Sequence, residues 1–306
     1  MTGPRWVVVA GFGRSGSTLL GMLLAEGGGF HCGELHLLWE ALVGGATCQC
    51  GAPVAACEVW AAVAAEARAE LGLRSDGEGA AIMEHRLRRR HLLAPRLPAP
   101  RPAELALRAA TERATERVTG ASLLVDTSKL SSVLWTAGHL DRPLTAVHLV
   151  RDPRAVAFSQ SRPKPDPSRA GGALPRRPVV ASAVDWWRGH LTTERVVRHL
   201  AGQGRLAGAW RVRYEDLVAD PEAYVRRLVP PAARRWGAAV TGPAAPAVTG
   251  PQHAVAGNPV RFGRAPVRPD DRWRTEMAAG PRALCTVLTA PMIRRYGYPL
   301  WAPSSS

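Results

Sequence analysis

The residues best suited to chemistry lie near the start of the chain, at positions 11–18 (GFGRSGST). A run of apolar, β-branched residues precedes them and leucines at helical spacing follow, which predicts a buried strand, a turn and a helix. Glycines permit a tight turn, and the free N–H groups of a helix N-terminus attract anions. Arg14 adds a positive charge. The stretch is therefore predicted to bind phosphate.

The spacing of this loop is close to that of a Walker A motif, since four residues separate Gly11 from Gly16 and Ser17-Thr18 follow. Ser17 occupies the place of the motif's lysine, which contacts the β- and γ-phosphates in nucleoside triphosphate enzymes. We therefore expect a loop that holds phosphate without the usual triphosphate machinery. The alternative is an ordinary strand–turn–helix corner, but packing alone does not account for Arg-Ser-Gly-Ser-Thr.

Polar residues also follow three other predicted strands, at positions 126–129, at Arg151 and at Tyr214. The carboxyl ends of parallel strands share the edge of the sheet at which α/β proteins bind ligands. The guanidinium of Arg151 can bind phosphate through two N–H groups, and Ser159 lies about two helical turns further on. A pairing of Arg151 with the aspartate beside it, and a solvated Ser159, are the structural alternatives.

With these motifs the chain resembles the sulfotransferases that use 3′-phosphoadenylyl sulfate (PAPS). Residues 14–18 (RSGST) resemble the family's loop for the 5′-phosphosulfate, and Arg151 with Ser159 resembles its 3′-phosphate motif. The runs VRYEDL at 212–217 and GNPVR at 257–261 resemble recurrent family elements. The resemblance extends from about residue 5 to residue 300 and implies these nucleotide-binding residues: Arg14, Ser15, Gly16, Ser17, Thr18, Arg151, Ser159, Tyr214, Asn258 and Arg261.

Sulfuryl transfer requires a deprotonated acceptor hydroxyl and a stabilised SO₃ group, which are matters of positioning and electrostatics. Lys129 is one of two lysines among 40 Lys+Arg residues, which indicates a role that a guanidinium fills poorly. Resemblance to the tyrosylprotein-sulfotransferase-like branch implies that Lys129 contacts the transferring group and that Glu34 is the catalytic base. Arg14 and Lys129 are expected to stabilise the transition state.

Three alternatives to these catalytic roles stay open at this point. Glu34 can serve only as a charge at a helix N-terminus, and Lys129 can be a solvated lysine. His31 and His36 are rival bases, because the cytosolic branch of the superfamily uses a histidine. That branch also places a lysine in its phosphate loop where this chain has Arg14, which makes a histidine base less attractive.

The order of predicted elements favours an α/β, P-loop-like three-layer fold with a central parallel sheet and helical insertions. We expect a single sulfotransferase domain over residues 1–306, with a cysteine-containing helical insertion at about 45–120 and an Ala/Pro-rich connector at about 232–251. The pattern also predicts a loop at 164–178, strands at 123–125, 144–150 and 210–214, and helices at 35–42, 58–73, 76–94, 103–119, 154–161, 179–202 and 280–296.

Charge and hydropathy narrow the setting of the protein. The formal charge of +15 comes almost entirely from arginine, which together with abundant Ala, Gly and Pro suggests a GC-rich, actinobacterial genome. This positive net charge favours an anionic ligand. No run of 18 apolar residues predicts a membrane span, and the N-terminus leads directly into the first strand without room for a signal peptide. These features predict a cytoplasmic protein, and the oligomeric state is left open.

The predicted function is transfer of sulfate from PAPS to a hydroxyl or phenol, with a small molecule or natural product as acceptor. A P-loop kinase or hydrolase is the first alternative, because residues 123–126 (LLVD) resemble a Walker B strand. The missing loop lysine argues against it. A basic nucleic-acid-binding protein is the second, but the arginines at 86–91 lack an aromatic platform, and the pattern predicts a solvated helix face and no specific nucleic acid.

Four cysteines near the N-terminus raise the question of a metal. Cys32, Cys48, Cys50 and Cys57 supply enough thiols for a tetrahedral zinc site. Their Cys-x-Cys-x₆-Cys spacing is not that of a standard zinc knuckle, however. Reduced cysteines or a disulfide are the alternatives, and the sequence predicts no metal.

Overall fold

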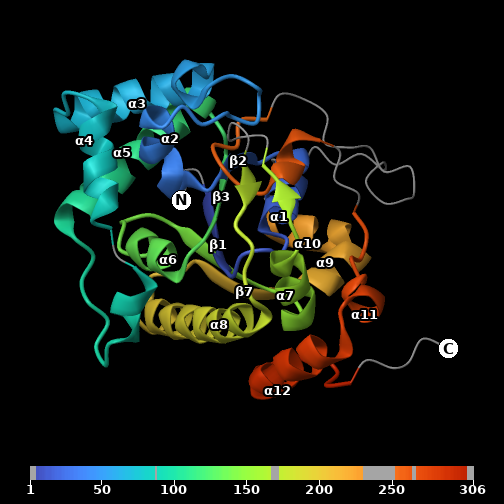
Figure 1. Ribbon diagram of the computed structural model, residues 1–306. Helices are drawn as coiled ribbons and strands as arrows, with labels where there is room; N and C mark the ends of the chain where they lie inside the picture. The colour runs from blue at the N-terminus through green and yellow to red at the C-terminus, as the bar shows by residue number, and fades with distance from the viewer. Residues whose placement is uncertain (1–4, 87, 167–171, 230–251, 264–266, 302–306) are drawn as a thin grey trace.

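A five-stranded parallel sheet forms the centre of the molecule, in the order β2-β3-β1-β4-β7 (Figure 1). The computed structural model describes residues 5–86, 88–166, 172–229, 252–263 and 267–301. The strands of the sheet are β1 (Arg5–Gly11), β2 (Phe30–Gly33), β3 (Leu123–Lys129), β4 (Leu144–Val150) and β7 (Gly208–Arg213). A separate antiparallel pair is formed by β5 (Lys164–Pro165) and β6 (Ala173–Leu174).

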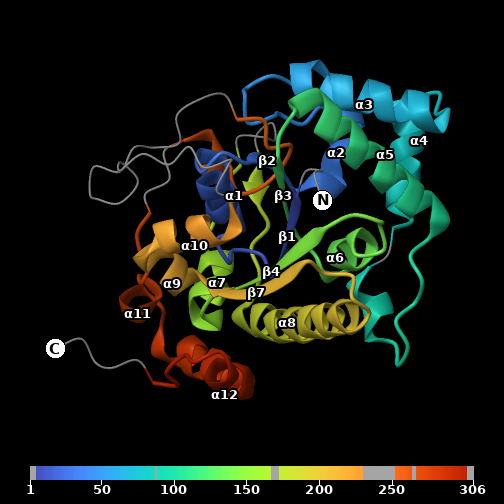
Figure 2. The same cartoon turned by 180° about the vertical axis from the view of Figure 1, so that it is seen from behind.

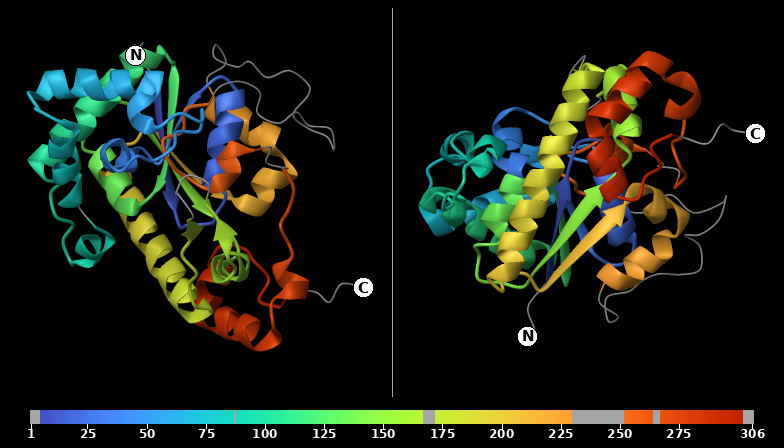
Figure 3. Two further views of the ribbon diagram at one scale, coloured as in Figure 1. Left: turned by 45° about the horizontal axis from the view of Figure 1, so that its top comes forward. Right: turned by 90° about the horizontal axis from the view of Figure 1, so that it is seen from below.

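Helices cover both faces of this sheet, as Figures 2 and 3 show from two further directions. The α-helices are α1 (Ser17–Glu26), α2 (Leu38–Val43), α3 (Glu58–Leu71), α4 (Asp76–Glu84), α5 (Pro102–Thr119), α6 (Ser131–Ala137), α7 (Pro153–Ser161), α8 (Val179–Gly202), α9 (Tyr214–Ala219), α10 (Pro221–Leu228), α11 (Trp273–Glu276) and α12 (Ala279–Arg295). The 3₁₀ helices are η1 (Leu35–Leu37), η2 (Val54–Ala56), η3 (Arg89–Leu93) and η5 (Pro259–Phe262). The α/β, P-loop-like three-layer fold predicted from the sequence is confirmed.

The central strand β1 explains why the sheet is covered on both faces. Trp6 and Val8 belong to the core beneath α2–α6 and α8, whereas Val7 and Val9 belong to the core beneath α1, α9 and α10. All four side chains are buried. Alternating side chains of a strand point to opposite faces, so a continuous apolar run requires a layer of helices on each side.

Several predicted elements have the expected bounds, including β4 and α8. Residues 30–33 form the edge strand β2, which the sequence analysis missed. The helix predicted over 76–94 ends at Glu84, and Arg86 bonds the Met83 carbonyl at 2.7 Å and Glu40 at 2.5 Å. The expected solvated face at 86–91 is therefore wrong for Arg86, which is buried.

Helices α3, α4 and α5 lie together at one end of the molecule (Figure 1). They lie within residues 45–120, the segment for which a helical insertion was predicted, and α3 packs along α5. The connector expected at 232–251 lies outside the described residues. Of the helices that the structure describes, none is long and apolar enough to cross a membrane.

Candidate active site

Each strand of the main sheet carries a candidate site residue at or just after its carboxyl end. Glu34 follows β2, Lys129 ends β3, Arg151 follows β4 and Tyr214 follows β7, while the loop at 11–18 leaves β1. These residues border a cleft of about 1670 Å³. The predicted residues that line the cleft are Arg14, Gly16, Ser17, Thr18, Glu34, Lys129, Arg151, Ser159, Tyr214 and Asn258.

The loop between β1 and α1 has the geometry of an anion site. Gly16 caps α1 in the left-handed conformation (φ 92°), and the first turn of the helix contains neither a side-chain cap nor an acidic residue. The amides at the start of α1 are therefore available to a ligand. Within the described structure, Arg14 Nη1 and the Ser15 hydroxyl are buried without a hydrogen-bond partner. An anion would satisfy such groups, because buried donors are normally paired.

Gly16 also permits the loop to approach Tyr214 closely. A Cβ atom at position 16 would lie 2.4 Å from Tyr214 Cδ2. The Tyr214 hydroxyl donates to the Arg268 carbonyl at 3.2 Å, and Arg151 Cζ lies 4.4 Å from the ring centroid. The Tyr214 ring therefore packs against both Arg151 and the loop at 11–18, which we call the phosphate loop, and fixes their positions.

Arg14 and Lys129 share an unusual backbone conformation. Among the described residues they are the only non-glycine residues with positive φ, at 67° and 66°. This conformation costs an L-residue roughly 1–2 kcal/mol. Such strain persists where the surrounding structure imposes it, and it is concentrated at functional sites. It distinguishes Arg14 and Lys129 from the other cationic residues that the structure describes.

Glu34 and Lys129 form an ion pair at the wall of the cleft. Lys129 Nζ donates to Glu34 Oε1, and the two side chains are only 17% and 15% exposed. The pair joins the ends of two neighbouring strands, because β2 pairs with β3. The Glu34 amide donates to the Ala256 carbonyl at 3.2 Å, which fixes the backbone beneath the carboxylate. A carboxylate and an ammonium are thus held together beside the phosphate loop.

The two rival histidines lie inside the protein and do not line this cleft. His31 Nε2 lies 3.0 Å from the Thr127 hydroxyl, and burial, with smaller contributions from Arg261 and Lys129, lowers its pKa to about 3. His36 is also buried, and burial lowers its pKa well below the usual value. Both imidazoles are neutral at physiological pH, but neither is placed to receive a proton from a substrate in the cleft.

Arg151 is held against the loop at 11–18 by hydrogen bonds. Its Nη1 donates to the Arg14 carbonyl at 3.0 Å, and its Nη2 lies 3.3 Å from Asp270 Oδ2. The neighbouring Asp152 pairs with Arg154 at 2.6 Å, so the alternative pairing within residues 151–152 does not form. Ser159, on α7, lines the same cleft. The structure therefore brings the two predicted phosphate motifs to one site.

Residues 252–263, which we call the strap, cross over the start of α1 (Figure 1). The Asn258 amide donates to the Thr18 hydroxyl at 3.1 Å, which fixes the strap to the phosphate loop. Arg261 does not line the cleft, although the sequence analysis placed it at the nucleotide. Its guanidinium is buried and donates to the Gly257 carbonyl at 2.8 Å and the Thr47 carbonyl at 3.2 Å, so it holds the strap in place.

Comparison with known proteins shows the family of this chain. A family model described as the sulfotransferase family matches residues 4–236, about three quarters of the chain. The chain belongs to the sulfotransferase family. The matched region contains every strand of the main sheet and ends before the strap.

The fold of this sulfotransferase is also found in a solved structure. The sulfotransferase domain of the Synechococcus PCC 7002 olefin synthase is 22% identical, with a TM-score of 0.52, over 98% of this chain and 97% of that one. The sulfotransferase domain from the curacin biosynthetic pathway is 18% identical, with a TM-score of 0.48, over 98% and 99%. A search of curated proteins found no significant match.

The carboxylate that resembled a Walker B aspartate has a different role in this sulfotransferase. Asp126 is fully buried, and its Oδ2 accepts from Arg108 Nη2 at 2.8 Å. Its Oδ1 accepts from the Ser128 amide at 2.9 Å, and Arg108 also binds Glu112 at 2.7 Å. Both oxygens of Asp126 are therefore engaged inside the protein, and Asp126 does not line the cleft.

Lys164 is among the cationic residues of the sulfotransferase cleft that the sequence analysis missed. Lys164, on β5, donates to Asn258 Oδ1 at 2.8 Å. Burial lowers its pKa, and the charges of Arg14 and Arg151 lower it further, which places its ammonium in the field of the phosphate site. The scarcity of lysine that singled out Lys129 applied equally to Lys164. The proline- and glycine-rich surroundings of Lys164 favoured a loop and concealed this signal.

Proposed function

We propose that this sulfotransferase takes the sulfuryl group from PAPS and transfers it to a hydroxyl or phenol of a small molecule. Family membership implies PAPS as the co-substrate. The observation that carries the proposal is the Glu34–Lys129 pair, which lies in the same cleft as an unsatisfied phosphate loop. A base, a compact cation and an anion cradle are the three components that sulfuryl transfer requires.

The proposed reaction is an in-line displacement at sulfur. Glu34 accepts the proton of the acceptor hydroxyl while the acceptor oxygen forms a bond to sulfur. The bond between sulfur and the phosphate oxygen breaks, and its electron pair leaves with adenosine 3′,5′-bisphosphate. Arg14, Lys129 and the amides at the start of α1 stabilise the charge that develops on the leaving group. This assigns Glu34 as the base and Arg14 and Lys129 as the electrostatic catalysts.

The nucleotide is proposed to bind with its two phosphates apart. Residues 14–18 bind the 5′-phosphate, and Arg151, Ser159 and Tyr214 bind the 3′-phosphate. Arg14, Arg151, Ser159 and Tyr214 all line the cleft, and Arg151 Nη1 donates to the Arg14 carbonyl at 3.0 Å, which supports this assignment. Asn258, on the strap, is proposed to contact the nucleotide as well. Lys164 is added to the proposed nucleotide-binding residues because it binds Asn258 beside the same loop.

The acceptor and the extent of the domain are inferred from the architecture. Leu174, Trp273 and Trp301 line the cleft together with the arginines, so it offers apolar as well as charged surface. Such a mixture suits a small organic acceptor. The Cys-Gly-Glu context of Glu34 favours the tyrosylprotein-sulfotransferase-like branch. The chain, with its helical insertion, is proposed to act as a single sulfotransferase domain.

The Glu34→Gln substitution tests the assigned base. We expect turnover with labelled PAPS and a panel of phenols and alcohols to fall by about 10²- to 10⁴-fold, because a positioned general base contributes about that factor. Calorimetric affinity for adenosine 3′,5′-bisphosphate should change little. Glu40→Gln is the matched control, because Glu40 pairs with Arg86 and does not line the cleft.

Two results would contradict the proposal. Loss of bisphosphate affinity in Glu34→Gln with unchanged turnover at saturation would remove Glu34 from the chemistry. Thermal stabilisation by ATP with Mg²⁺, but none by the bisphosphate without Mg²⁺, would favour a triphosphate enzyme. A ligand at about 100 times its Kd should stabilise the fold by about 2.7 kcal/mol, which a melting experiment detects readily.

A further inference from the structure

A cluster of metal-ligating side chains lies outside the cleft, where the sequence alone placed only thiols. The Sγ atoms of Cys48, Cys50 and Cys57 and a ring nitrogen of His253 all lie within 4.8 Å of one another. Cys57 Sγ is 3.3 Å from His253 Nδ1. Cys32, which the sequence analysis grouped with these thiols, is not in the cluster. Its Sγ lies 4.0 Å from the Phe30 carbonyl.

The donor set and its dimensions suit tetrahedral zinc. Zinc binds thiolate sulfur at about 2.3 Å and imidazole nitrogen at about 2.0–2.1 Å, so ligands of one tetrahedron lie about 3.5–3.8 Å apart. The observed ligand atoms all lie within 4.8 Å of one another, and the Cys57 Sγ to His253 Nδ1 distance of 3.3 Å is close to that spacing. Three thiolates and one imidazole select zinc over hard cations such as Mg²⁺ or Ca²⁺. All four positions come from the protein, which is the pattern of a structural site.

The backbone around the cysteines forms a compact knuckle at residues 47–57. Thr47 and Pro53 form an antiparallel bridge, and the Gly51 amide donates to the Cys48 carbonyl at 3.0 Å. Gly51 has φ 93°, so the turn between the cysteines needs a residue that tolerates the left-handed region. Cys50 is exposed on this turn, whereas Cys48 and Cys57 are buried. The knuckle presents three thiols to one point.

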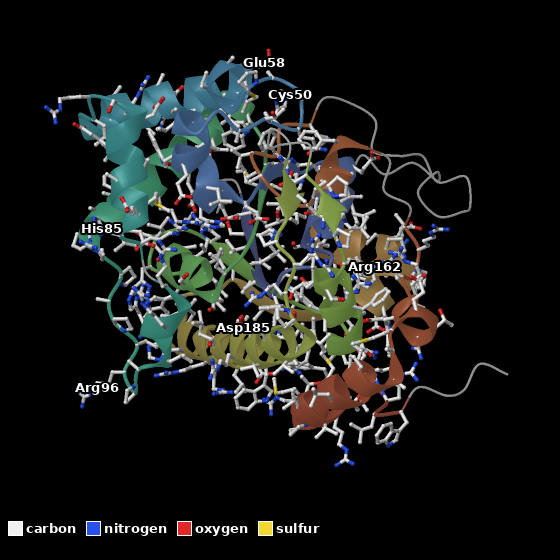
Figure 4. The ribbon with its side chains drawn as sticks, viewed as in Figure 1. Cys50, Glu58, His85, Arg96, Arg162 and Asp185 are labelled. Carbon is white, nitrogen blue, oxygen red and sulfur yellow. The ribbon has the colours of Figure 1, made fainter. Side chains whose placement is uncertain are left out.

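His253 is held toward the knuckle by its own contacts. Trp60 donates its indole N–H to the His253 carbonyl, and the Phe30 ring stacks on the imidazole with a centroid distance of 6.4 Å. His253 Nδ1 faces Cys57, while Nε2 lies 3.9 Å from Glu58 Oε1. Figure 4 shows Cys50 and Glu58 at the same edge of the molecule. The distance from Nε2 to Glu58 Oε1 is beyond a hydrogen bond, but it places a carboxylate near the second ring nitrogen, where a zinc-bound histidine usually has its support.

We propose that Cys48, Cys50, Cys57 and His253 bind a structural zinc ion that fastens the strap to the knuckle. On binding, each thiol loses its proton to solvent and the three sulfurs and Nδ1 each donate an electron pair to the metal. His253 lies on the strap, and its contact with Cys57 spans 196 residues of sequence. The ion therefore joins two segments that no local element connects.

The metal site is linked to the phosphate loop through the strap. Gln49 lies between two of the cysteines. Its backbone N–H donates to the Ala254 carbonyl at 3.1 Å, and its side-chain Nε2 donates to the Arg261 carbonyl at 2.7 Å. Further along the strap, the Ala256 carbonyl accepts from the Glu34 amide and the Asn258 amide binds Thr18. Zinc is therefore a positioning element for the nucleotide site, a role that rests on the proposed function.

Metal analysis of the purified chain is the first test. Protein expressed with zinc and dialysed against metal-free buffer should contain about one zinc ion per chain, measured by plasma mass spectrometry. Cobalt exchanged into the site should give the thiolate charge-transfer and tetrahedral ligand-field bands. Cys50→Ser and His253→Ala should lose the metal, while His253→Cys, which keeps four ligands, should retain it. Cys285→Ala is the control, because Cys285 is buried in α12, outside the cluster.

The second measurement connects the metal to the nucleotide. We expect Cys50→Ser, in which only an exposed side chain changes, to remain folded by circular dichroism and to bind adenosine 3′,5′-bisphosphate about tenfold more weakly, equivalent to about 1.4 kcal/mol. His253→Cys, which keeps four ligands, should retain the wild-type affinity for the bisphosphate. Wild-type affinity in a metal-free, folded Cys50→Ser protein would overturn the positioning role.

Other outcomes separate this proposal from the proposed function. Absence of zinc from wild-type protein even after incubation with Zn²⁺, or a disulfide between two cluster cysteines detected by mass spectrometry after alkylation, would overturn the metal site. Metal content is measured before any nucleotide is added. A chain that holds zinc through these four residues but does not bind the bisphosphate would support the metal site and contradict the proposed function.

Discussion

The close approach of Gly16 to Tyr214 in the candidate active site gives a sharp prediction for Gly16→Ala. The new Cβ would lie 2.4 Å from Tyr214 Cδ2 and 2.9 Å from Cε2, both well inside van der Waals contact. The ring cannot easily withdraw, because its hydroxyl is bonded to the Arg268 carbonyl and Arg151 lies over it. The phosphate loop must therefore move instead.

Two separate effects set the magnitude. An alanine at φ 92° costs roughly 1–2 kcal/mol in backbone energy, and overpacking against a fixed ring costs about 1–3 kcal/mol more. We expect the free energy of unfolding to fall by about 2–5 kcal/mol. Because the overlap displaces the amides that bind the anion, affinity for adenosine 3′,5′-bisphosphate should fall by about 10- to 100-fold, at 1.4 kcal/mol for each factor of ten.

Gly72→Ala is the matched control for this prediction. Gly72 caps α3 at φ 65°, and a Cβ at that position would meet nothing within 4 Å. It therefore carries the backbone cost alone, about 1–2 kcal/mol in stability, and should leave nucleotide affinity unchanged. Urea denaturation and calorimetric titration of both variants separate the two effects. If Gly16→Ala bound the bisphosphate as tightly as Gly72→Ala does, the loop would not be placed by Tyr214 and the reasoning would be refuted.

Two further predictions concern buried charge. Burial lowers the pKa of His148 to about 3, so its contribution to stability is complete above about pH 6.5 and is lost as the pH falls toward 3. His148→Gln should therefore reduce the slope of the unfolding free energy between pH 4 and 6 by about 1.4 kcal/mol per pH unit. Equal slopes for the variant and the wild type would contradict this prediction. Arg108→Met leaves the buried Asp126 without its cation and should lower the free energy of unfolding, measured by denaturation, by about 3–5 kcal/mol. Arg113→Met breaks an exposed ion pair and should lower it by at most about 1 kcal/mol. Similar losses in the two variants would contradict this prediction.

The part of the fold that the sequence predicted well rests on strong local patterns. The apolar run of β1, the strand at 144–150 and the helix at 179–202 each have a clear period or a clear boundary. Because parallel strands place their carboxyl ends on one edge, the same patterns also brought Arg14, Lys129 and Arg151 to one site. Local periodicity and a general rule of α/β topology were sufficient for this much.

What the sequence did not predict depends on contacts between distant segments. The strand β2 has only four residues and contains a histidine, so its apolar signal is short. The buried position of the Arg261 side chain follows from its bonds to the carbonyls of residues 47 and 257, and the partner of Cys57 is a histidine 196 residues away. No local pattern reports such pairings, because they arise only when the sheet brings the segments together.

The connection between the Asn258 amide and the Thr18 hydroxyl joins residues 240 positions apart. All strands of the main sheet lie before residue 214, whereas Asn258, Asp270 and α12 come later. During synthesis from the N-terminus, the sheet can therefore assemble before the far wall of the cleft has left the ribosome. The nascent chain acquires its architecture first and its nucleotide-binding competence only when the strap and the residues that follow it have been made.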